Sequence, residues 1–215
     1  VGTVPRFLDR SFRNWYSMGV GRPKEFERDV VLDRAMQVFW SRGYAATSIQ
    51  HLVARMGIQR GSLYDTFGDK RRLFFAAIER YDRVETAKLL AALDEPASGT
   101  TAIRRFFRLK VEMATAPGRP RGCLVTNSAA ELTARDRGTG TRVGAVLAKI
   151  EAAFQRAVIR AQAAGEIDPK RNPRALARFL TSSAQGLSVM AKALPDRAAL
   201  DDIVEVILEV VDRRR

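Results

Sequence analysis

Few side chains in this sequence have the chemistry of catalysis or metal binding. The chain has one cysteine, Cys123, and one histidine, His51. A disulfide needs two cysteines and a structural zinc site needs about four such ligands, so we predict no disulfide, no metal and no cofactor. No Ser-His-Asp set and no phosphate-binding glycine loop is present. We predict that the protein is not an enzyme, and keep an all-α enzyme that uses Cys123 as an alternative.

A second group of polar side chains lies between residues 47 and 70, where the apolar pattern predicts two short helices. In the first helix Ile49, Leu52, Val53 and Met56 follow the i, i+3, i+4, i+7 spacing of one buried face. We expect Thr47 to cap this helix, with Gln50 completing a capping box. Gly57 can adopt the left-handed conformation that ends it.

The second helix is about two turns long. Leu63 and Phe67 form its buried stripe, so Arg60, Ser62, Asp65 and Thr66 face outward. Two helices around a glycine turn are the layout of a helix-turn-helix, whose second helix enters the major groove of DNA. The same pattern also occurs in helical proteins that bind no nucleic acid.

Residues 47–74 resemble the N-terminal domain of the TetR family of bacterial repressors. The matching residues are Thr47, Ile49, Ala54, Gly57, Gly61, Leu63, Tyr64, Phe67, Lys70, Leu73 and Phe74. The resemblance implies that Gly61 lets the backbone approach DNA closely and that Tyr64 and Lys70 bind phosphate. It also implies a phosphate contact from Thr47 or Ser48.

The side chains expected to read bases are Arg60, which can bond a guanine edge, and the shorter polar Gln59 and Ser62. Arg22 and Lys24, in the arm before the first helix, are expected to follow the DNA backbone or reach a minor groove. Many relatives have serine or threonine where this chain has Gln59. Because glutamine caps a helix poorly, Gln59 either reads a base or leaves the second helix frayed without DNA.

Composition favours a folded protein with a polyanionic partner. The 215 residues are 46% hydrophobic, and 37 basic against 24 acidic side chains give a net charge of +13. That charge attracts DNA and is equally compatible with a protein that binds DNA without sequence preference. No apolar stretch approaches the roughly 20 residues that span a bilayer, so we predict a cytoplasmic protein that does not interact with membranes.

We expect residues 1–21 to be an N-terminal extension. Met18 precedes a sequence typical of the first residues of many TetR relatives, which favours a mis-annotated start at Val1. The alternative is an amphipathic helix with Leu8, Phe12 and Trp15 on one side.

The remaining chain has helical periodicity and predicts an all-α fold of about nine helices. We expect a first helix over 26–42, the two helices of the motif, and a fourth helix from Asp69 to about Leu93. Five more are expected near 100–116, 122–136, 140–164, 172–193 and 197–213. We predict a DNA-binding domain over 22–80 and a ligand-binding and dimerisation domain over 81–215.

The last two predicted helices carry long apolar stripes. One has Leu176, Phe179, Leu180, Ser183 and Leu187; the other has Leu200, Ile203, Val204, Ile207, Leu208 and Val211. In TetR relatives these helices pair across a two-fold axis, so the resemblance implies a homodimer that binds a palindromic operator. The stripes could equally fill the core of one subunit.

The resemblance also implies a small-molecule effector that binds in the C-terminal domain and releases the repressor from DNA. The expected pocket residues are Phe106, Phe107, Met113, Leu124, Asn127, Phe154 and Gln185. Aromatic residues at helical spacing also form ordinary cores. Cys123 is either a sensor thiol or, as for most cysteines before apolar residues, a buried and inert one.

Overall fold

The computed structural model describes residues 25–94, 98–118 and 122–212, so residues 1–21, Arg22 and Lys24 lie outside the described chain. Within these ranges the regular secondary structure is helical, as predicted. The elements are α1 (Glu25–Arg42), α2 (Ile49–Met56), α3 (Arg60–Phe67), α4 (Lys70–Tyr81), a π-helical segment η2 (Asp82–Thr86), α5 (Ala87–Asp94), α6 (Gly99–Thr115), α7 (Leu124–Leu132), α8 (Arg137–Ala163), α9 (Pro173–Ala193) and α10 (Arg197–Val211).

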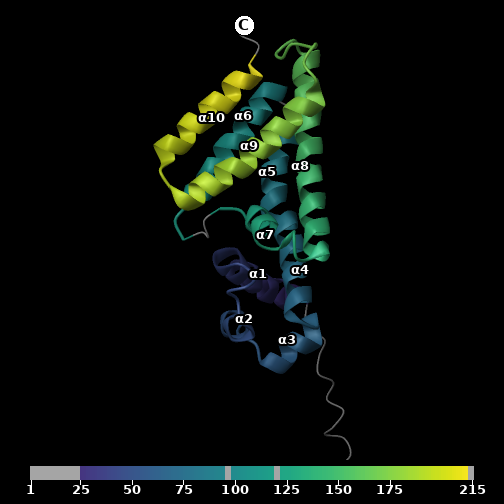
Figure 1. Ribbon diagram of the computed structural model, residues 1–215, viewed down its shortest axis with the longest axis vertical. Coiled ribbons are helices and arrows are strands. Elements are labelled where there is room, and N and C mark those ends of the chain that lie inside the picture. Colours follow the sequence, from purple (N-terminus) through teal and green to yellow (C-terminus); the bar gives the residue numbers. More distant parts are fainter. Residues whose placement is uncertain (1–24, 95–97, 119–121, 213–215) are drawn as a thin grey trace, which may run out of the picture.

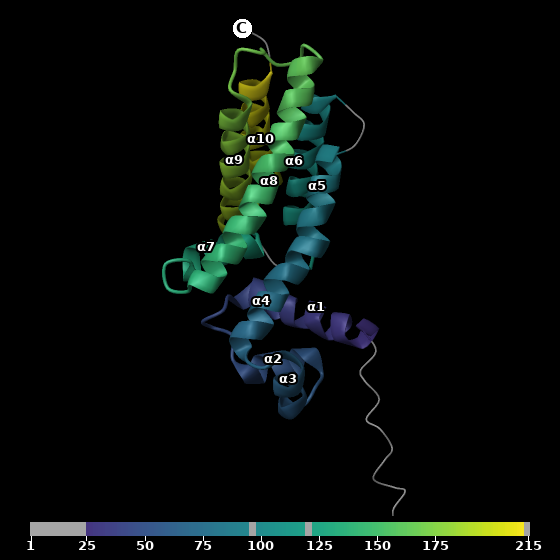
Figure 2. The same ribbon diagram turned by 90° about the vertical axis from the view of Figure 1, so that its right-hand side faces the viewer.

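α4, η2 and α5 form one continuous helical stretch from Lys70 to Asp94. Counted as one, it makes nine helices in the described chain, which agrees with the prediction. η2 is a widened turn inside the stretch. The stretch begins beside α3 at one end of the molecule and runs up into the bundle formed by the later helices (Figures 1 and 2).

Helices α1 to α4 form a small unit around an apolar core, here called the α1–α4 unit. The rings of Phe39 and Phe74 pack edge to face with centroids 5.0 Å apart. Arg80 of α4 pairs with Asp29 and Asp33 of α1 at 2.6 and 2.8 Å. Its side chain is only 19% exposed, so these ion pairs are partly shielded from water. They fix α4 against α1.

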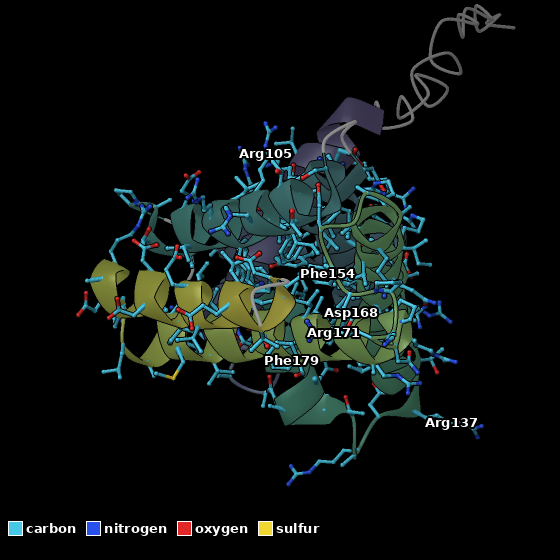
Figure 3. All side chains as sticks on the ribbon, turned by 90° about the horizontal axis from the view of Figure 1, so that it is seen from above. Arg105, Arg137, Phe154, Asp168, Arg171 and Phe179 are labelled. Atoms are coloured by element: carbon cyan, nitrogen blue, oxygen red, sulfur yellow. The ribbon has the colours of Figure 1, made fainter. Side chains whose placement is uncertain are left out.

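Helices α5, α6, α8, α9 and α10 form the second part of the molecule, here called the C-terminal bundle (Figure 1). Its centre holds Phe106, Phe107 and Phe154, whose ring centroids lie 4.6 to 5.8 Å apart. Figure 3, which looks down on the bundle, places Phe154 inside it. No described helix has the length and apolar composition needed to cross a membrane.

The predicted boundary between the sixth and seventh helices, which are α7 and α8 in the structure, is wrong. α7 ends at Leu132 instead of near 136, and α8 begins at Arg137 instead of near 140. The Asp136 carboxylate starts α8 early, because it accepts the backbone N–H of Gly138 at 2.9 Å. Gly138 therefore lies inside the helix, where a Cβ would come within 2.7 Å of the Phe75 ring. This glycine allows α8 to pack closely against α4.

Candidate nucleic-acid interface and cavities

The start of α2 has a reciprocal cap, but not from the residues predicted. Ser48 is the N-cap: its Oγ accepts the backbone N–H of His51 at 3.1 Å, while His51 Nδ1 accepts the backbone N–H of Ser48 at 3.2 Å. The prediction of Thr47 and Gln50 was therefore wrong. Thr47 is buried, and its hydroxyl donates to the Gly43 carbonyl oxygen. Ser48, not Thr47, is exposed for a partner to contact.

The predicted turn between α2 and α3 is confirmed. Gly57 ends α2 with φ +72°, in the left-handed region that favours glycine. Gln59 stands at the N-cap of α3 without any side-chain cap bond, as its type predicted. Its side chain is therefore not used to hold α3 in place.

One side of α3 is packed and the other is free. Leu63 and Phe67 are buried. Arg60, Gly61, Ser62 and Tyr64 are exposed, as are Asp65 and Thr66. The Arg60 guanidinium lies 5.7 Å from the centroid of the Tyr64 ring and donates a long hydrogen bond of 3.4 Å to the Tyr64 hydroxyl. This weak contact leaves most of the guanidinium donors available.

Gly61 has no structural reason within the described chain to be glycine. A Cβ at this position would meet no atom within 4 Å, and its φ is not in the left-handed region. Glycine inside a helix costs about 0.5–1 kcal/mol relative to alanine. An exposed glycine that the fold does not require suggests a partner that approaches the backbone here.

Lys70 is the first residue of α4, directly after the Asp69 cap that was predicted. Its Nζ lies 4.2 Å from the centroid of the Tyr44 ring, a cation–π contact. Partial burial lowers the pKa of Lys70, and the Glu131 carboxylate opposes that shift. α2, α3 and the start of α4, with the N-caps of α2 and α3, lie at the end of the molecule farthest from the C-terminal bundle (Figure 2). These segments contain the predicted residues Ser48, Gln59–Ser62, Tyr64 and Lys70.

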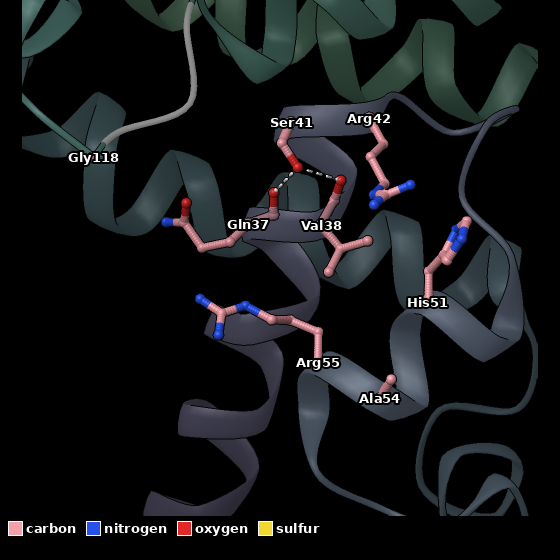
Figure 4. Close-up of a pocket in the computed structure, with 8 residues that line it drawn as sticks. All are labelled: Gln37, Val38, Ser41, Arg42, His51, Ala54, Arg55 and Gly118. Atoms are coloured by element: carbon pink, nitrogen blue, oxygen red, sulfur yellow. Dashed lines mark hydrogen bonds between the residues drawn. The ribbon is translucent and has the colours of Figure 1, made fainter.

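A polar hollow of about 550 Å³ opens on another side of the α1–α4 unit (Figure 4). It is lined by Gln37, Val38, Ser41, Arg42, His51, Ala54, Arg55 and Gly118. Ser41 Oγ donates to the carbonyl oxygens of Gln37 and Val38, at 2.9 and 3.1 Å. None of the residues predicted to contact DNA lines this hollow.

Two small cavities lie where the C-terminal bundle meets α1 and α4. They have volumes of about 30 and 20 Å³ and share four lining residues, Tyr81, Leu89, Lys110 and Cys123. We call these two cavities together the divided cavity. Cys123 is buried and free.

The predicted pocket residues divide into two groups. Phe106 and Gln185 line one part of the divided cavity, and Met113 lines the other. Phe107 and Phe154 instead pack against Phe106 in the aromatic core, and Leu124 is buried without lining either part. Asn127 accepts a hydrogen bond from Lys192 Nζ at 3.2 Å and lies outside both parts.

Sequence reasoning missed Lys110 and Tyr81 as cavity residues. A signal was present for Lys110, because Ile103, Phe106, Phe107, Lys110 and Val111 follow the spacing of one helix face. That spacing places Lys110 on the buried side of α6, and the structure leaves it only 8% exposed.

The apolar stripes of α9 and α10 mostly fill the core of the subunit. Leu176, Leu180, Leu200, Val204 and Leu208 are buried. One edge of these stripes, which includes Phe179, Ser183 and Ile203, instead lines an exposed apolar groove of about 760 Å³. The groove is lined by Phe179, Ser183, Gly186, Leu187, Val189, Met190, Asp202, Ile203, Val206 and Ile207. Phe179, labelled in Figure 3, is 38% exposed and Val206 is 61% exposed.

Both parts of the chain match known protein families. The model for bacterial regulatory proteins of the tetR family matches residues 31–77, and the model for the tetracyclin repressor-like C-terminal domain matches residues 99–207. The HTH-type transcriptional regulator YezE of Bacillus subtilis is 38% identical over 90% of this chain and 100% of YezE. The HTH-type transcriptional repressor ComR of Escherichia coli is 33% identical over 86% of this chain and 88% of ComR.

Solved structures show the same fold. The TetR family regulator CifR, as a cysteine mutant complexed with a 26-base-pair operator DNA, is 32% identical, covers 89% of this chain and 100% of that chain, and has a TM-score of 0.81. A TetR regulator from Chloroflexus aurantiacus has a TM-score of 0.80 at 23% identity, which supports the fold alone. From its helix-turn-helix and these full-length matches, the chain belongs to the TetR family, whose members are DNA-binding transcriptional regulators and not enzymes.

Proposed function

We propose that this protein is a homodimeric repressor that binds a near-palindromic operator and leaves it when a small-molecule effector binds. The observation that carries the proposal is the exposed side of α3, where Arg60, Ser62 and Tyr64 surround a glycine that the fold does not need. The DNA complex of the related CifR supports it.

The contacts divide by chemistry. Arg60 can donate two parallel hydrogen bonds to a guanine edge, and Gln59 and Ser62 can read neighbouring bases. Ser48, Tyr64 and Lys70 bind phosphate, which sets the register of α3 without reading sequence. Arg22 and Lys24 extend the contacts along the backbone. Gly61 allows the helix to approach closely.

Recognition of a full operator requires a dimer. One α3 contacts only a few base pairs, so two must lie roughly 34 Å or a multiple of that distance apart to recognise two half-sites. The exposed groove of α9 and α10 supplies an apolar face for the second subunit. Exposed Phe179, Val189 and Met190 are the kind of side chains that are buried in stable dimers.

Release follows from a change in the separation of the two α3 helices. An effector that binds more tightly to the subunit arrangement incompatible with DNA shifts the population toward it. We assign effector binding and dimerisation to residues 81–215 and DNA binding to 22–80. The continuous stretch from α4 to α5 joins the two, and the protein acts in the cytoplasm, where the DNA is.

The test is fluorescence anisotropy with labelled DNA from the intergenic region upstream of the gene, beside a scrambled duplex, at about 150 mM salt. We expect tight binding of two subunits per site to the native fragment only. Equal, weak binding to both duplexes would instead indicate a protein that binds DNA without sequence preference.

A further inference from the structure

Lys110 is a buried lysine for which the described part of the chain provides no ion pair. It lies on the inner face of α6 and is only 8% exposed. Among the described residues its Nζ has no hydrogen bond and no ion pair. An ammonium held mostly out of water without a partner is costly. Burial lowers the pKa of Lys110, and Cys123 opposes that shift. An anion that entered this place would remove that cost.

The space beside Lys110 could receive a small molecule. Lys110 lines both parts of the divided cavity, and Cys123 and Tyr81 do the same. Each part is larger than the roughly 15 Å³ that one water molecule requires. The walls combine the polar ends of Lys110, Cys123 and Gln185 with apolar side chains such as Leu89 and Phe106. This is the composition of a site for a short molecule with one charged end.

We propose that the effector is a small organic anion, such as a short-chain carboxylate, whose acidic group pairs with Lys110 beside Cys123. The inference rests on the proposed function, since it names the chemical class of the effector. The charged group binds the ammonium, and the apolar remainder of the molecule lies against Leu89, Phe106 and Ile150. The small volumes restrict the effector to a few non-hydrogen atoms.

An occupant of the divided cavity would contact the α1–α4 unit directly. Trp40 of α1 lines one part, and Tyr81 at the end of α4 lines both. The two rings pack edge to face with centroids 4.9 Å apart, and Trp40 Nε1 donates to the Gly122 carbonyl oxygen at 3.2 Å. A molecule placed here therefore presses on the helices that position α2 and α3.

The first test uses two alkylating reagents of nearly equal size and different charge. Iodoacetate is an anion and iodoacetamide is neutral. Because Cys123 is the only cysteine in the chain, mass spectrometry of its peptide after digestion follows thiol alkylation at this one site. The measured quantity is the rate constant with iodoacetate divided by that with iodoacetamide. A change in the thiolate fraction of Cys123 affects both reagents equally and cancels in this ratio.

We expect Lys110→Met to lower this ratio about tenfold, because the cation that attracts iodoacetate is gone. Lys110→Arg should retain most of the ratio. The control Lys170→Met, which removes an equal charge from an exposed position, should leave it unchanged. If Lys110→Met fails to fold, Lys110→Gln makes the same comparison. An unchanged ratio, or no alkylation of the folded protein by either reagent, would overturn the proposal.

The second test measures reversible binding through Trp40. In a Trp15→Phe background Trp40 is the only tryptophan, so its fluorescence reports the cavity. Acetate, propionate and butyrate are titrated to about 10 mM beside the corresponding neutral amides. We expect a saturable change with at least one carboxylate, none with its amide, and none in Lys110→Met. Equal responses to acid and amide, or no response to any carboxylate, would contradict the proposal.

Neither test needs DNA, so the two proposals can fail separately. If the protein ignores its operator while the alkylation ratio depends on Lys110, the proposed function fails and the anion site stands. If the protein binds its operator but the ratio is insensitive to Lys110, only the anionic effector is excluded.

Discussion

The Glu131 carboxylate of α7 accepts the backbone N–H of Ala45, in the turn between α1 and α2, at 2.6 Å. Its second oxygen accepts the N–H of Tyr44 at 3.0 Å. α7 starts beside Cys123 at the divided cavity and ends near this turn, so one short helix connects the cavity to the start of the helix-turn-helix. α7 is thus a second connection between the two parts of the molecule, in addition to the α4–α5 stretch.

Removing the Glu131 carboxylate should loosen this connection. Hydrogen bonds to a charged group contribute about 1.5–3 kcal/mol each, and this pair is partly exposed, so we expect Glu131→Ala to lose about 2 kcal/mol of unfolding free energy. Urea denaturation followed by circular dichroism measures the loss. Glu131→Gln keeps one acceptor and should lose less. Equal stability of the alanine variant and the wild type would show that the connection contributes nothing.

Gly61→Ala should separate stability from DNA binding. The new Cβ points into open space and alanine favours the helix, so we expect the unfolding free energy to rise by about 0.4–1 kcal/mol. Operator affinity should fall, because the methyl group holds the α3 backbone away from the DNA. Denaturation and anisotropy on the same preparation measure both changes. If stability rises with no loss of affinity, the DNA does not approach this residue.

Arg60→Ala and Lys70→Ala should weaken DNA binding in different ways. Arg60 is assigned to a base edge, so its loss should cost about 1–3 kcal/mol and relax sequence preference. Lys70 is assigned to phosphate, so its loss should weaken binding to all sequences and reduce the slope of affinity against salt by about one. Titrations of native and scrambled duplexes at several salt concentrations distinguish the two. Equal loss of specificity in both variants would contradict the assignment.

The helices of the α1–α4 unit could be predicted because their signals are local. Gly57 ends α2 and Asp69 caps α4, and each effect depends on residues within one turn. The choice between Thr47 and Ser48 as cap was not local. Tertiary packing buries Thr47, whose hydroxyl then bonds Gly43, and the cap moves to the next residue.

The cavity could not be predicted in the same way. Lysine is usually exposed, so its residue type predicts that Lys110 lies on the surface. Only the spacing of the apolar residues around it on the same helix face indicates that it is buried. The width of the η2 turn and the contact of Trp40 with Gly122 depend on how distant helices pack, which periodicity does not encode. Periodicity also identified α9 and α10 as apolar without showing which face is left exposed.

A charge placed in the apolar groove of α9 and α10 should disrupt the proposed dimer. Val206 is 61% exposed in the subunit, so Val206→Glu should leave the fold intact and place a carboxylate in the apolar groove. We expect sedimentation to change from a dimer to a monomer of 23.9 kDa, with loss of operator binding. Ile159→Glu, at an exposed apolar position of α8 outside the groove, is the control. A Val206→Glu variant that remains dimeric would move the interface elsewhere.

Asp136 predicts a pH dependence of stability. Its hydrogen bond from Arg71, at 2.8 Å, and that from the Gly138 N–H lower the pKa of Asp136 well below its usual range. Because the folded pKa lies below the unfolded value of about 3.9, the stabilisation is complete above that pH and is lost as the pH falls further. Asp136→Asn keeps a capping side chain but removes the charge, so it should be less stable than the wild type at pH 7, and the difference should become clearly smaller at about pH 2. Urea denaturation of both proteins at the two pH values measures the difference in their free energies of unfolding. If that difference does not change with pH, Asp136 stabilises the fold through the shape of its side chain and not through its charge.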